Sequence, residues 1–250
     1  TTLTLSGLIG TETLGQSVGS TFNNKNVGTG KTVTVNSITL ANGSNGGLAS
    51  NYSISAGQTT TANITAKGLT VSGITASNKG YDGNATATLN VSSISYGGLV
   101  SGDSFSGIYS AVFNNANVAS GKTVTITSNY TGTDVSNYSV TGQSSTTANI
   151  TKRDLVLSSL SASDKVYDGN NSATNSSTIS GFVGSETINH SLTTTFDNKN
   201  VGSSKVVTVN SVSLTNGSNG GLAANYSLST GQTTTANITA KALTASASAA

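Results

Sequence analysis

The feature that most limits the possible folds of this chain is internal repetition. The hexapeptide TTANIT occurs at residues 60–65, 146–151 and 234–239, and the tripeptide NYS precedes each copy. Residues 22–67 align without gaps to residues 196–241, with 36 of 46 positions identical. The middle copy aligns with both only through insertions and deletions. Self-similarity of this kind indicates modules joined in series, so we expect a tandem array rather than one merged globule.

The expected domain boundaries follow each TTANIT. We predict a first repeat at residues 1–65 that lacks its N-terminal part, complete repeats at 66–151 (the middle repeat) and 152–239 (the third repeat), and the start of a further repeat at 240–250. The junctions NITAKGLTV and NITKRDLVL leave few residues between the last strand of one repeat and the first strand of the next. Short joins limit bending, so we expect an elongated and fairly stiff rod.

The fold class is predicted from short alternating runs of Val, Ile and Thr. Each repeat carries such runs, for example at residues 32–40, 51–57, 59–66 and 69–77, separated by turn clusters such as NGSNGG. Alternation of this kind is typical of strands, and no segment shows a helical period over ten residues. We expect an all-β protein built of tandem small, Ig-like β-sandwich domains; a β-grasp-like or partly open sheet is the alternative.

Composition excludes several classes of function. Charged residues are 8% of the chain, and the net charge of +2 includes no basic run, which argues against nucleic acid binding. No run approaches the roughly 18 apolar residues of a membrane span. His190 is the only histidine, and the nine acidic residues are scattered singly. We therefore predict no catalytic residue, no cofactor-binding residue and no metal site.

The segment VGTGKTVTV at residues 27–35 resembles part of a phosphate-binding loop, but its context is wrong. A nucleotide loop needs an earlier glycine, where Lys25 stands, and a helix after the lysine. Here an alternating strand pattern follows Lys31, and the third copy has Ser204-Lys205-Val206 in place of Gly30-Lys31-Thr32. We expect the segment to be part of a strand.

The segments KGYDGN at 79–84 and KVYDGN at 165–170 are predicted to be structural turns. Glycine tolerates the positive φ of a tight turn, and an aspartate side chain bonds nearby backbone amides. A tyrosine at a strand end buries its ring while its hydroxyl reaches a partner. The predicted turn residues are Tyr81, Asp82, Gly83, Tyr167, Asp168 and Gly169. A calcium or sugar site around the aspartate is the alternative, although calcium prefers several carboxylates.

The ordered set of Tyr-Asp-Gly, VGTGKTVTV, NYS and TTANIT resembles the YDG-type repeats of large bacterial surface proteins. Such repeats occur in filamentous-haemagglutinin-like adhesins exported by two-partner secretion. The resemblance implies a structural stalk or filament segment of a secreted adhesin, extracellular on the bacterial cell surface, which projects or links cells and is not an enzyme. The alternatives are a self-associating extracellular filament subunit and a glycan- or protein-binding adhesive module. The partners implied are neighbouring repeats and other copies in a filament, with the host or cell-surface receptor unknown and no membrane insertion.

Two further recurrent residue types allow alternative interpretations. Lysines recur at Lys31, Lys122 and Lys205 and at Lys79 and Lys165; we interpret them as guards of edge strands, with a Lys–Asn crosslink as the alternative. The chain has 14 Asn-x-Ser/Thr sequons. A subset is a candidate for N-glycosylation, and the alternative is that Asn serves turns. The candidate positions are Asn51, Asn63, Asn137, Asn149, Asn225 and Asn237.

Overall fold

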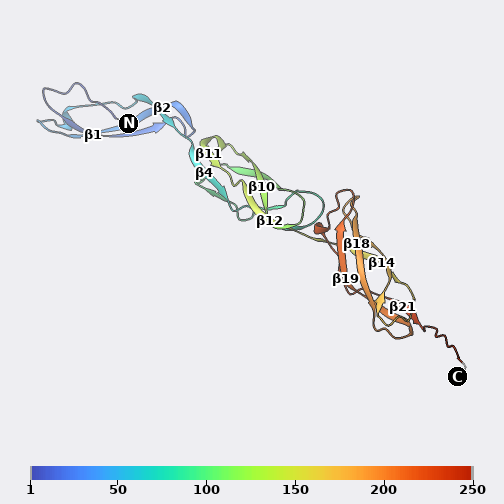
Figure 1. Cartoon of the computed structure of the whole chain (residues 1–250). Coiled ribbons are helices and arrows are strands. Elements are labelled where there is room, and N and C mark those ends of the chain that lie inside the picture. Colours follow the sequence, from blue (N-terminus) through green and yellow to red (C-terminus); the bar gives the residue numbers. More distant parts are fainter. Residues whose placement is uncertain (1, 249–250) are drawn as a thin grey trace. The chain divides into compact units, whose positions relative to one another are not determined.

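The computed structural model describes residues 2–248, and this part of the chain is all-β, as predicted. Its only helices are three single-turn 3-10 helices, and none of them is long and apolar enough to cross a bilayer. The further repeat predicted at 240–250 is described as far as Ser248, without a strand, and its last two residues lie outside the described range. The chain divides into two compact units. Figure 1 traces its strands along the sequence, from blue at the N-terminus to red at the C-terminus.

The first unit comprises Thr1–Gly73, Ile94–Ile108 and Ser128–Gln143, that is, the first repeat and one part of the middle repeat. Its antiparallel sheet has the order β1-β2-β3 and contains β1 (Leu14–Phe22), β2 (Gly28–Asn42) and β3 (Thr59–Ile64). A second sheet has the order β11-β4-β8 and contains β4 (Lys67–Ser72), β8 (Ser95–Gly97) and β11 (Tyr138–Thr141). Helices η1 (Ala49–Asn51) and η2 (Val135–Asn137) immediately precede the NYS tyrosines.

The second unit comprises Ile74–Ser93, Tyr109–Thr127 and Ser144–Ala250. From the middle repeat it has the sheets β6-β12-β10-β9 and β5-β7, made of β5 (Thr75–Ala76), β6 (Lys79–Gly80), β7 (Leu89–Asn90), β12 (Ser145–Thr151) and parts of β9 (Ser106–Phe113) and β10 (Ala119–Thr131). From the third repeat it has the sheets β15-β21-β19-β18-β16, β14-β17 and β13-β20. These contain β13 (Arg153–Asp154), β14 (Val156–Ala162), β15 (Lys165–Val166), β16 (Ser172–Ala173), β17 (Asn175–Ser180), β18 (Ile188–Phe196), β19 (Gly202–Asn216), β20 (Tyr226–Ser227) and β21 (Thr233–Thr239), with helix η3 (Ala223–Asn225) before β20.

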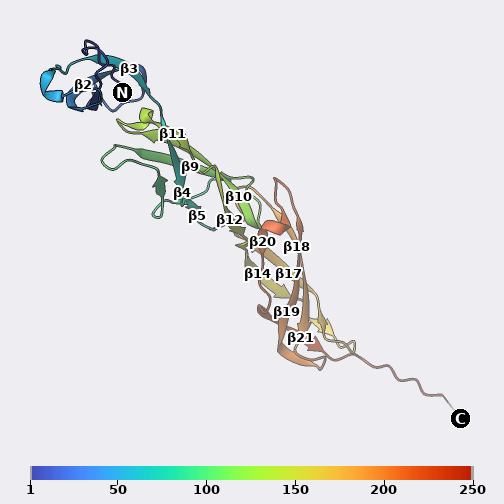
Figure 2. The same ribbon diagram turned by 90° about the vertical axis from the view of Figure 1, so that its left-hand side faces the viewer.

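The core of the third repeat is small and lies between two layers. Phe196, Val207, Ala236 and Ile238 are buried on one face of the five-stranded sheet, because alternate residues of β19 and β21 point inward. The ribbon β14-β17 lies against this sheet (Figure 2), with β14 in contact with β21, and Ala162 at the end of β14 packs on the cluster.

One predicted strand is wrong in the first repeat. Residues 52–57 do not form a strand there, whereas the matching segments form β11 in the middle repeat and β20 in the third. The reason is the pairing partner: β11 pairs in parallel with β4, and β20 with β13. Residues 52–57 pair with no strand in the described part of the chain.

Candidate functional site

The Tyr-Asp-Gly segments form turns that enclose a lysine. In the third repeat, the backbone N–H of Asn170 donates to Asp168 Oδ1 at 3.1 Å, and Gly169 has a φ of 84°, in the left-handed region. Four oxygens accept hydrogen bonds from the Lys165 ammonium at distances between 2.9 and 3.0 Å: Asp168 Oδ1, Asn170 O, Asn170 Oδ1 and Ser172 O. The middle repeat repeats this arrangement around Lys79, where Gly83 has a φ of 80°.

The enclosed lysine sets the charge state of each turn. Hydrogen bonds from Lys165 and then from the Asn170 N–H hold the pKa of Asp168 below its usual range. Burial raises the pKa of Asp82, but the opposing hydrogen bonds from Lys79 and from the Asn84 N–H are stronger together, and the pKa is lowered. Among residues 2–248 there is no group of three His, Cys, Asp or Glu side chains placed to hold a metal ion.

The other recurrent lysines lie on central strands, so their interpretation as edge guards is wrong. Lys31, Lys122 and Lys205 belong to β2, β10 and β19, each of which has a neighbour on both sides. A β-bulge turns each ammonium back onto the preceding loop: Lys122 is 6% exposed and donates to Asn115 Oδ1 at 2.8 Å. Lys79 and Lys165 do lie on edge strands, but their ammonium groups bind the turn described above. The Lys–Asn crosslink stays a prediction, which intact mass can check.

The segment that resembles a phosphate loop is this same bulge. Gly30 has a φ of 61°, and its N–H donates to Asn63 Oδ1 at 2.8 Å. In the third repeat Ser204 takes the same place with a φ of 48°, and its N–H donates to Asn237 Oδ1 at 2.8 Å. The asparagine of TTANIT thus caps a bulge within one repeat, and β2 continues past Lys31 to Asn42.

Each NYS tyrosine binds a carboxylate of its own repeat. The Tyr226 hydroxyl donates to Glu186 Oε2 at 2.7 Å and accepts from the Val183 N–H at 3.0 Å. Tyr138 and Asp103 form the equivalent pair at 2.5 Å, and Tyr52 donates to Glu12. We define the tip of a repeat as this acidic residue together with the asparagine and the tyrosine of NYS. The tips are Glu12, Asn51 and Tyr52; Asp103, Asn137 and Tyr138; and Glu186, Asn225 and Tyr226.

The tip of the third repeat contacts the middle repeat inside the second unit. Asn225 is 1% exposed; its Oδ1 accepts from the Val118 N–H at 2.9 Å, and its Nδ2 donates to Asn117 Oδ1 at 3.1 Å. The hydroxyl of Tyr81 donates to Glu186 Oε1 at 2.7 Å. Burial, and then this hydrogen bond to Glu186, raises the pKa of Tyr81 to about 12. The tyrosine of the Tyr-Asp-Gly turn is therefore a contact between two repeats.

Inside the first unit, the tip of the middle repeat contacts the first repeat in the same way. Asn137 Oδ1 accepts from the Val27 N–H at 2.9 Å, and Asn137 Nδ2 donates to Asn26 Oδ1 at 3.3 Å. The ammonium of Lys25 lies 2.6 Å from Asp103 Oδ1 and 2.8 Å from Asp134 Oδ1. Its hydrogen bonds are the main cause of the lowered pKa values of both carboxyl groups.

The residues that receive a tip form what we call the socket of a repeat. The first repeat offers Lys25, Asn26 and Val27, and the middle repeat offers Tyr81, Asn117 and Val118. The asparagine contacts are identical in the two junctions, whereas the carboxylate is bound differently. Ala116 stands where the first repeat has Lys25, and the hydroxyl of Tyr81 binds the carboxylate instead.

The six candidate glycosylation positions therefore fall into two structural classes. Asn51, Asn137 and Asn225 belong to tips, whereas Asn63, Asn149 and Asn237 cap bulges through Oδ1. Sugar is attached to the side-chain nitrogen of asparagine. That nitrogen donates across a junction in Asn137 and Asn225, and to Asp164 in Asn237 at 2.9 Å.

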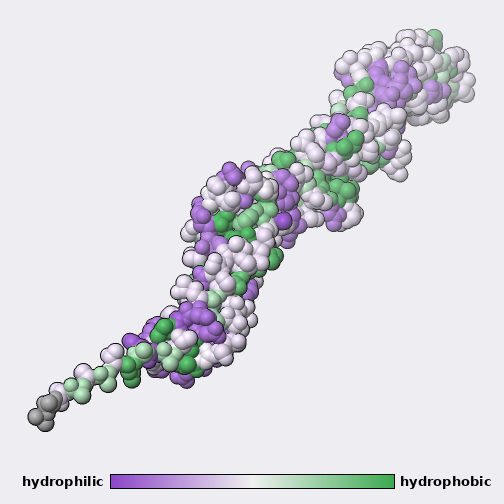
Figure 3. Space-filling view, turned by 90° about the vertical axis from the view of Figure 1, so that its right-hand side faces the viewer, coloured by the Kyte–Doolittle hydropathy of each residue, from purple (hydrophilic) through white to green (hydrophobic). Residues whose placement is uncertain are grey.

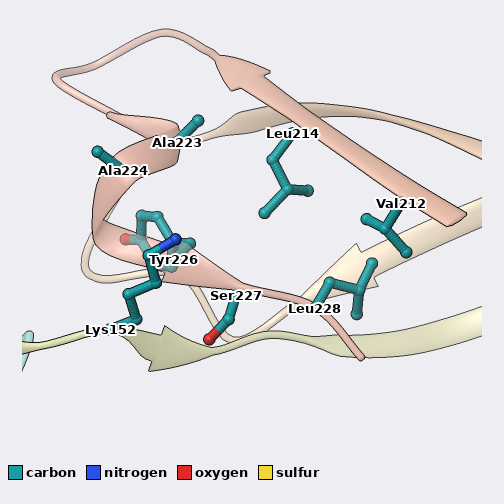
Figure 4. Close-up of a pocket in the computed structure, with 8 residues that line it drawn as sticks. All are labelled: Lys152, Val212, Leu214, Ala223, Ala224, Tyr226, Ser227 and Leu228. Atoms are coloured by element: carbon teal, nitrogen blue, oxygen red, sulfur yellow. The ribbon is translucent and has the colours of Figure 1, made fainter. Parts of the chain in front are cut away.

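One hollow of the third repeat is lined by both apolar and polar residues. It has a volume of about 440 Å³ and lies between β19 and the segment of β20. Figure 4 shows Leu214 pointing into this space, with Val212 and Leu228 beside it and Lys152 near Tyr226 at the opposite end. On the face shown in Figure 3, apolar residues form small areas among neutral and hydrophilic ones.

Sequence reasoning missed the tip and socket as a unit. It treated the acidic residues as scattered, yet each repeat has one acidic residue at the same place before a long strand: Glu12, Asp103 and Glu186. The recurrence of NYS and of the NV pair in NKNVG was visible. Nothing in the alternation of residues indicated that these two motifs meet across a boundary between repeats.

The fold and these contacts define a class of protein, in which an all-β module is repeated in series and recurrent tip–socket contacts join neighbours. A family model for the YDG domain matches residues 1–62, 65–148 and 151–247. The chain belongs to the YDG domain family, so the predicted resemblance to YDG repeats is confirmed, whereas the adhesin context stays a prediction. No curated protein and no solved structure matches the chain significantly.

Proposed function

We propose that the chain is a structural stalk or filament segment of a secreted bacterial surface adhesin, with a role outside the cell and without catalysis. The observation that carries this proposal is the repeated junction. The same two asparagine hydrogen bonds join the first repeat to the middle one and the middle one to the third. A contact that recurs at each boundary supports a function in which neighbouring repeats are held in a fixed orientation.

The energy of a junction favours restricted bending rather than a permanent lock. A neutral hydrogen bond contributes about 0.5–1.5 kcal/mol, and one to a charged group about 1.5–3 kcal/mol. Two asparagine bonds therefore contribute about 1–3 kcal/mol per junction, to which the contact with the carboxylate adds. Such a junction stays closed most of the time and opens under load, which suits a spacer that transmits tension between cells.

We further propose that each complete repeat is an Ig-like β-sandwich. Its two-layer core supports this, and so does the parallel pairing of an early strand with the last one, as β15 does with β21 and β6 with β12. The β-grasp-like alternative has less support, because that fold packs a helix on its sheet and residues 2–248 contain only single-turn helices.

Among the sequons, we propose Asn63 and Asn149 as the glycosylated subset. Their Oδ1 atoms cap bulges, and their Nδ2 atoms have no hydrogen-bond partner within residues 2–248. A sugar on Nδ2 of Asn225 would not fit a side chain that is 1% exposed and packed against Asn117. Peptide mass spectrometry of native material, finding sugar on Asn225 and none on Asn63, would contradict this assignment.

Solution scattering tests the proposed function. Wild-type chain and a variant with both junction asparagines changed, Asn137→Ala with Asn225→Ala, are compared under identical conditions. We expect the wild type to scatter as a rod of constant length, and the variant to show the broader distribution of a jointed chain. Indistinguishable profiles would refute the proposal that the junctions fix the orientation of neighbours.

A further inference from the structure

The tip of the middle repeat has a second carboxylate beside it. Asp134 directly precedes helix η2, and its side chain is 11% exposed, compared with 9% for Asp103. The Oδ1 atoms of both aspartates contact the Lys25 ammonium, at 2.6 Å for Asp103 and 2.8 Å for Asp134. The other oxygen of each is held inside the middle repeat, by the Tyr138 hydroxyl and by the Ser104 N–H. Two largely buried negative charges thus share one positive charge, which the first repeat supplies.

The tip of the third repeat has no second charge beside it. Leu222 directly precedes helix η3, in the place that Asp134 has before η2. The carboxylate of this tip, Glu186, accepts from Tyr81 through Oε1 and from Tyr226 through Oε2, each at 2.7 Å. Both donors are neutral hydroxyl groups, and within residues 2–248 no lysine or arginine forms an ion pair with Glu186. This tip is therefore satisfied without a cation.

The two occupied sockets differ in the same sense as the tips that they receive. FNNKNV at residues 22–27 aligns with FNNANV at residues 113–118, which places Ala116 at the position of Lys25. The lysine socket receives the tip with two carboxylates, and the alanine socket receives the tip with one. The asparagine hydrogen bonds are the same at both junctions, so the junctions differ in how charge is matched.

We propose that this matching of charge selects which repeat docks on which. A tip with two carboxylates favours a socket that carries lysine, whereas a tip with one carboxylate also fits a socket without it. The inference deepens the proposed function and rests on it. The partner that the middle repeat prefers is therefore a lysine-bearing repeat rather than a second copy of itself.

The selection rests on the penalty for the wrong pairing. A middle-type tip on a middle-type socket would keep the asparagine hydrogen bonds but would bury two carboxylates with no cation beside them. Both Oδ1 atoms contact the same ammonium, so without it two like charges would lie close together. Removing one partner of a buried charge pair is costly because it leaves the other charge unpaired, and a group that penalises the wrong partner is a general source of specificity.

Transferring the charge pattern of one junction to the other tests the inference in the full chain. Leu222→Asp gives the third tip a second carboxylate, and Ala116→Lys gives its socket a lysine. The readout is hydrogen exchange of the Val118 amide, which is bonded across this junction. The Lys25 side chain is 61% exposed, and solvent screening weakens such contacts, so we expect Leu222→Asp to raise the exchange rate by about fivefold or more. Adding Ala116→Lys should return the rate to within about twofold of the wild type.

Leu48→Asp is the matched control for the transfer. It makes the same substitution directly before helix η1, in a tip that lies at neither internal junction. It should leave the exchange rate of the Val118 amide unchanged.

The first junction provides the reverse test. Lys25→Ala should raise the exchange rate of the Val27 amide, which is bonded to Asn137 across that junction. Asp134→Asn removes one negative charge and keeps an oxygen that can accept from the Ser104 N–H. In a chain that carries Asp134→Asn, Lys25→Ala should therefore raise the exchange rate less than it does in the wild type.

The same measurements separate the two proposals. If the Val27 and Val118 amides of the wild type exchange as fast as unbonded amides, the junctions are not formed, and the proposed function fails together with the inference. Protected amides with no effect of Leu222→Asp beyond that of Leu48→Asp, or with no recovery on adding Ala116→Lys, would overturn the inference alone. An equal effect of Lys25→Ala with and without Asp134→Asn would also overturn it alone.

Discussion

Replacing Asn225 with alanine should open the junction between the middle and third repeats while leaving each repeat folded. The side chain is 1% exposed and makes two hydrogen bonds, to the Val118 N–H and to Asn117 Oδ1. Both are lost in Asn225→Ala. At about 0.5–1.5 kcal/mol each, the loss is about 1–3 kcal/mol, which corresponds to a roughly 5–150-fold rise in the open population.

Native-state hydrogen exchange of the Val118 amide measures this change directly. That N–H has Asn225 Oδ1 as its acceptor, so its protection reports local opening of the junction rather than global unfolding. We expect its exchange rate to rise by the factor above, while amides inside β18 and β19 keep their rates.

Asn51→Ala is the matched control. It changes the same residue of the same motif, in a tip whose side chain has no partner in the described part of the chain. The internal amides should therefore exchange as in the wild type. If Asn51→Ala and Asn225→Ala raised the exchange rate of Val118 equally, or if neither did, the junction would not rest on this asparagine and the reasoning would fail.

Three further predictions concern the same contacts. Tyr81→Phe keeps the ring and removes the hydroxyl, so the junction should weaken by about 1–3 kcal/mol as read by exchange at the socket, whereas Tyr167→Phe should change nothing in dilute monomer. Gly83→Ala should destabilise the protein more than Gly169→Ala in thermal unfolding. Both substitutions place alanine at a positive φ, which costs about 1 kcal/mol, but only at Gly83 would the new Cβ lie 2.7 Å from a side chain of the next repeat, Val183. Equal losses of stability would contradict this. The carboxyl groups that bind Lys25 have lowered pKa values when docked, so that contact should be complete above about pH 4 and be lost as the pH falls further. The contact of Tyr81, whose pKa is raised to about 12, should instead be complete below about pH 10 and be lost between about 10 and 12. Amide chemical shifts at the two sockets measure both contacts, and shifts that moved together with pH would refute the assignment.

The all-β class and the repeat pattern could be predicted because both are local properties of the sequence. Alternation over five to nine residues reports which face of a strand is buried, and this placed β2 and β3 close to where they lie. The same reasoning predicted a strand at residues 51–57, where none forms. In the other two repeats the matching segment forms a strand where it pairs with a strand about 70 residues earlier, and alternation carries no information about such pairing.

The junctions were harder to predict for a second physical reason. Asn26 and Asn137 look like ordinary turn residues, since asparagine is common in turns. Their role appears only when two loops 110 residues apart are brought together, and the main acceptor–donor pair uses the backbone N–H of Val27, which no side-chain pattern reveals. The prediction that Lys122 guards an edge strand was wrong for a related reason. Its strand is central in the sheet, and a β-bulge turns the side chain inward, which the sequence alone does not indicate.

The use of a main-chain amide as the receiving group also affects how such an array can change in evolution. Every residue except proline supplies the same N–H at that position, so substitutions in the receiving loop do not remove the principal contact. Only the donated asparagine has to be preserved. A duplicated or deleted copy would thus find a compatible neighbour without compensating mutations, and the number of copies could vary between lineages while each boundary kept the same geometry.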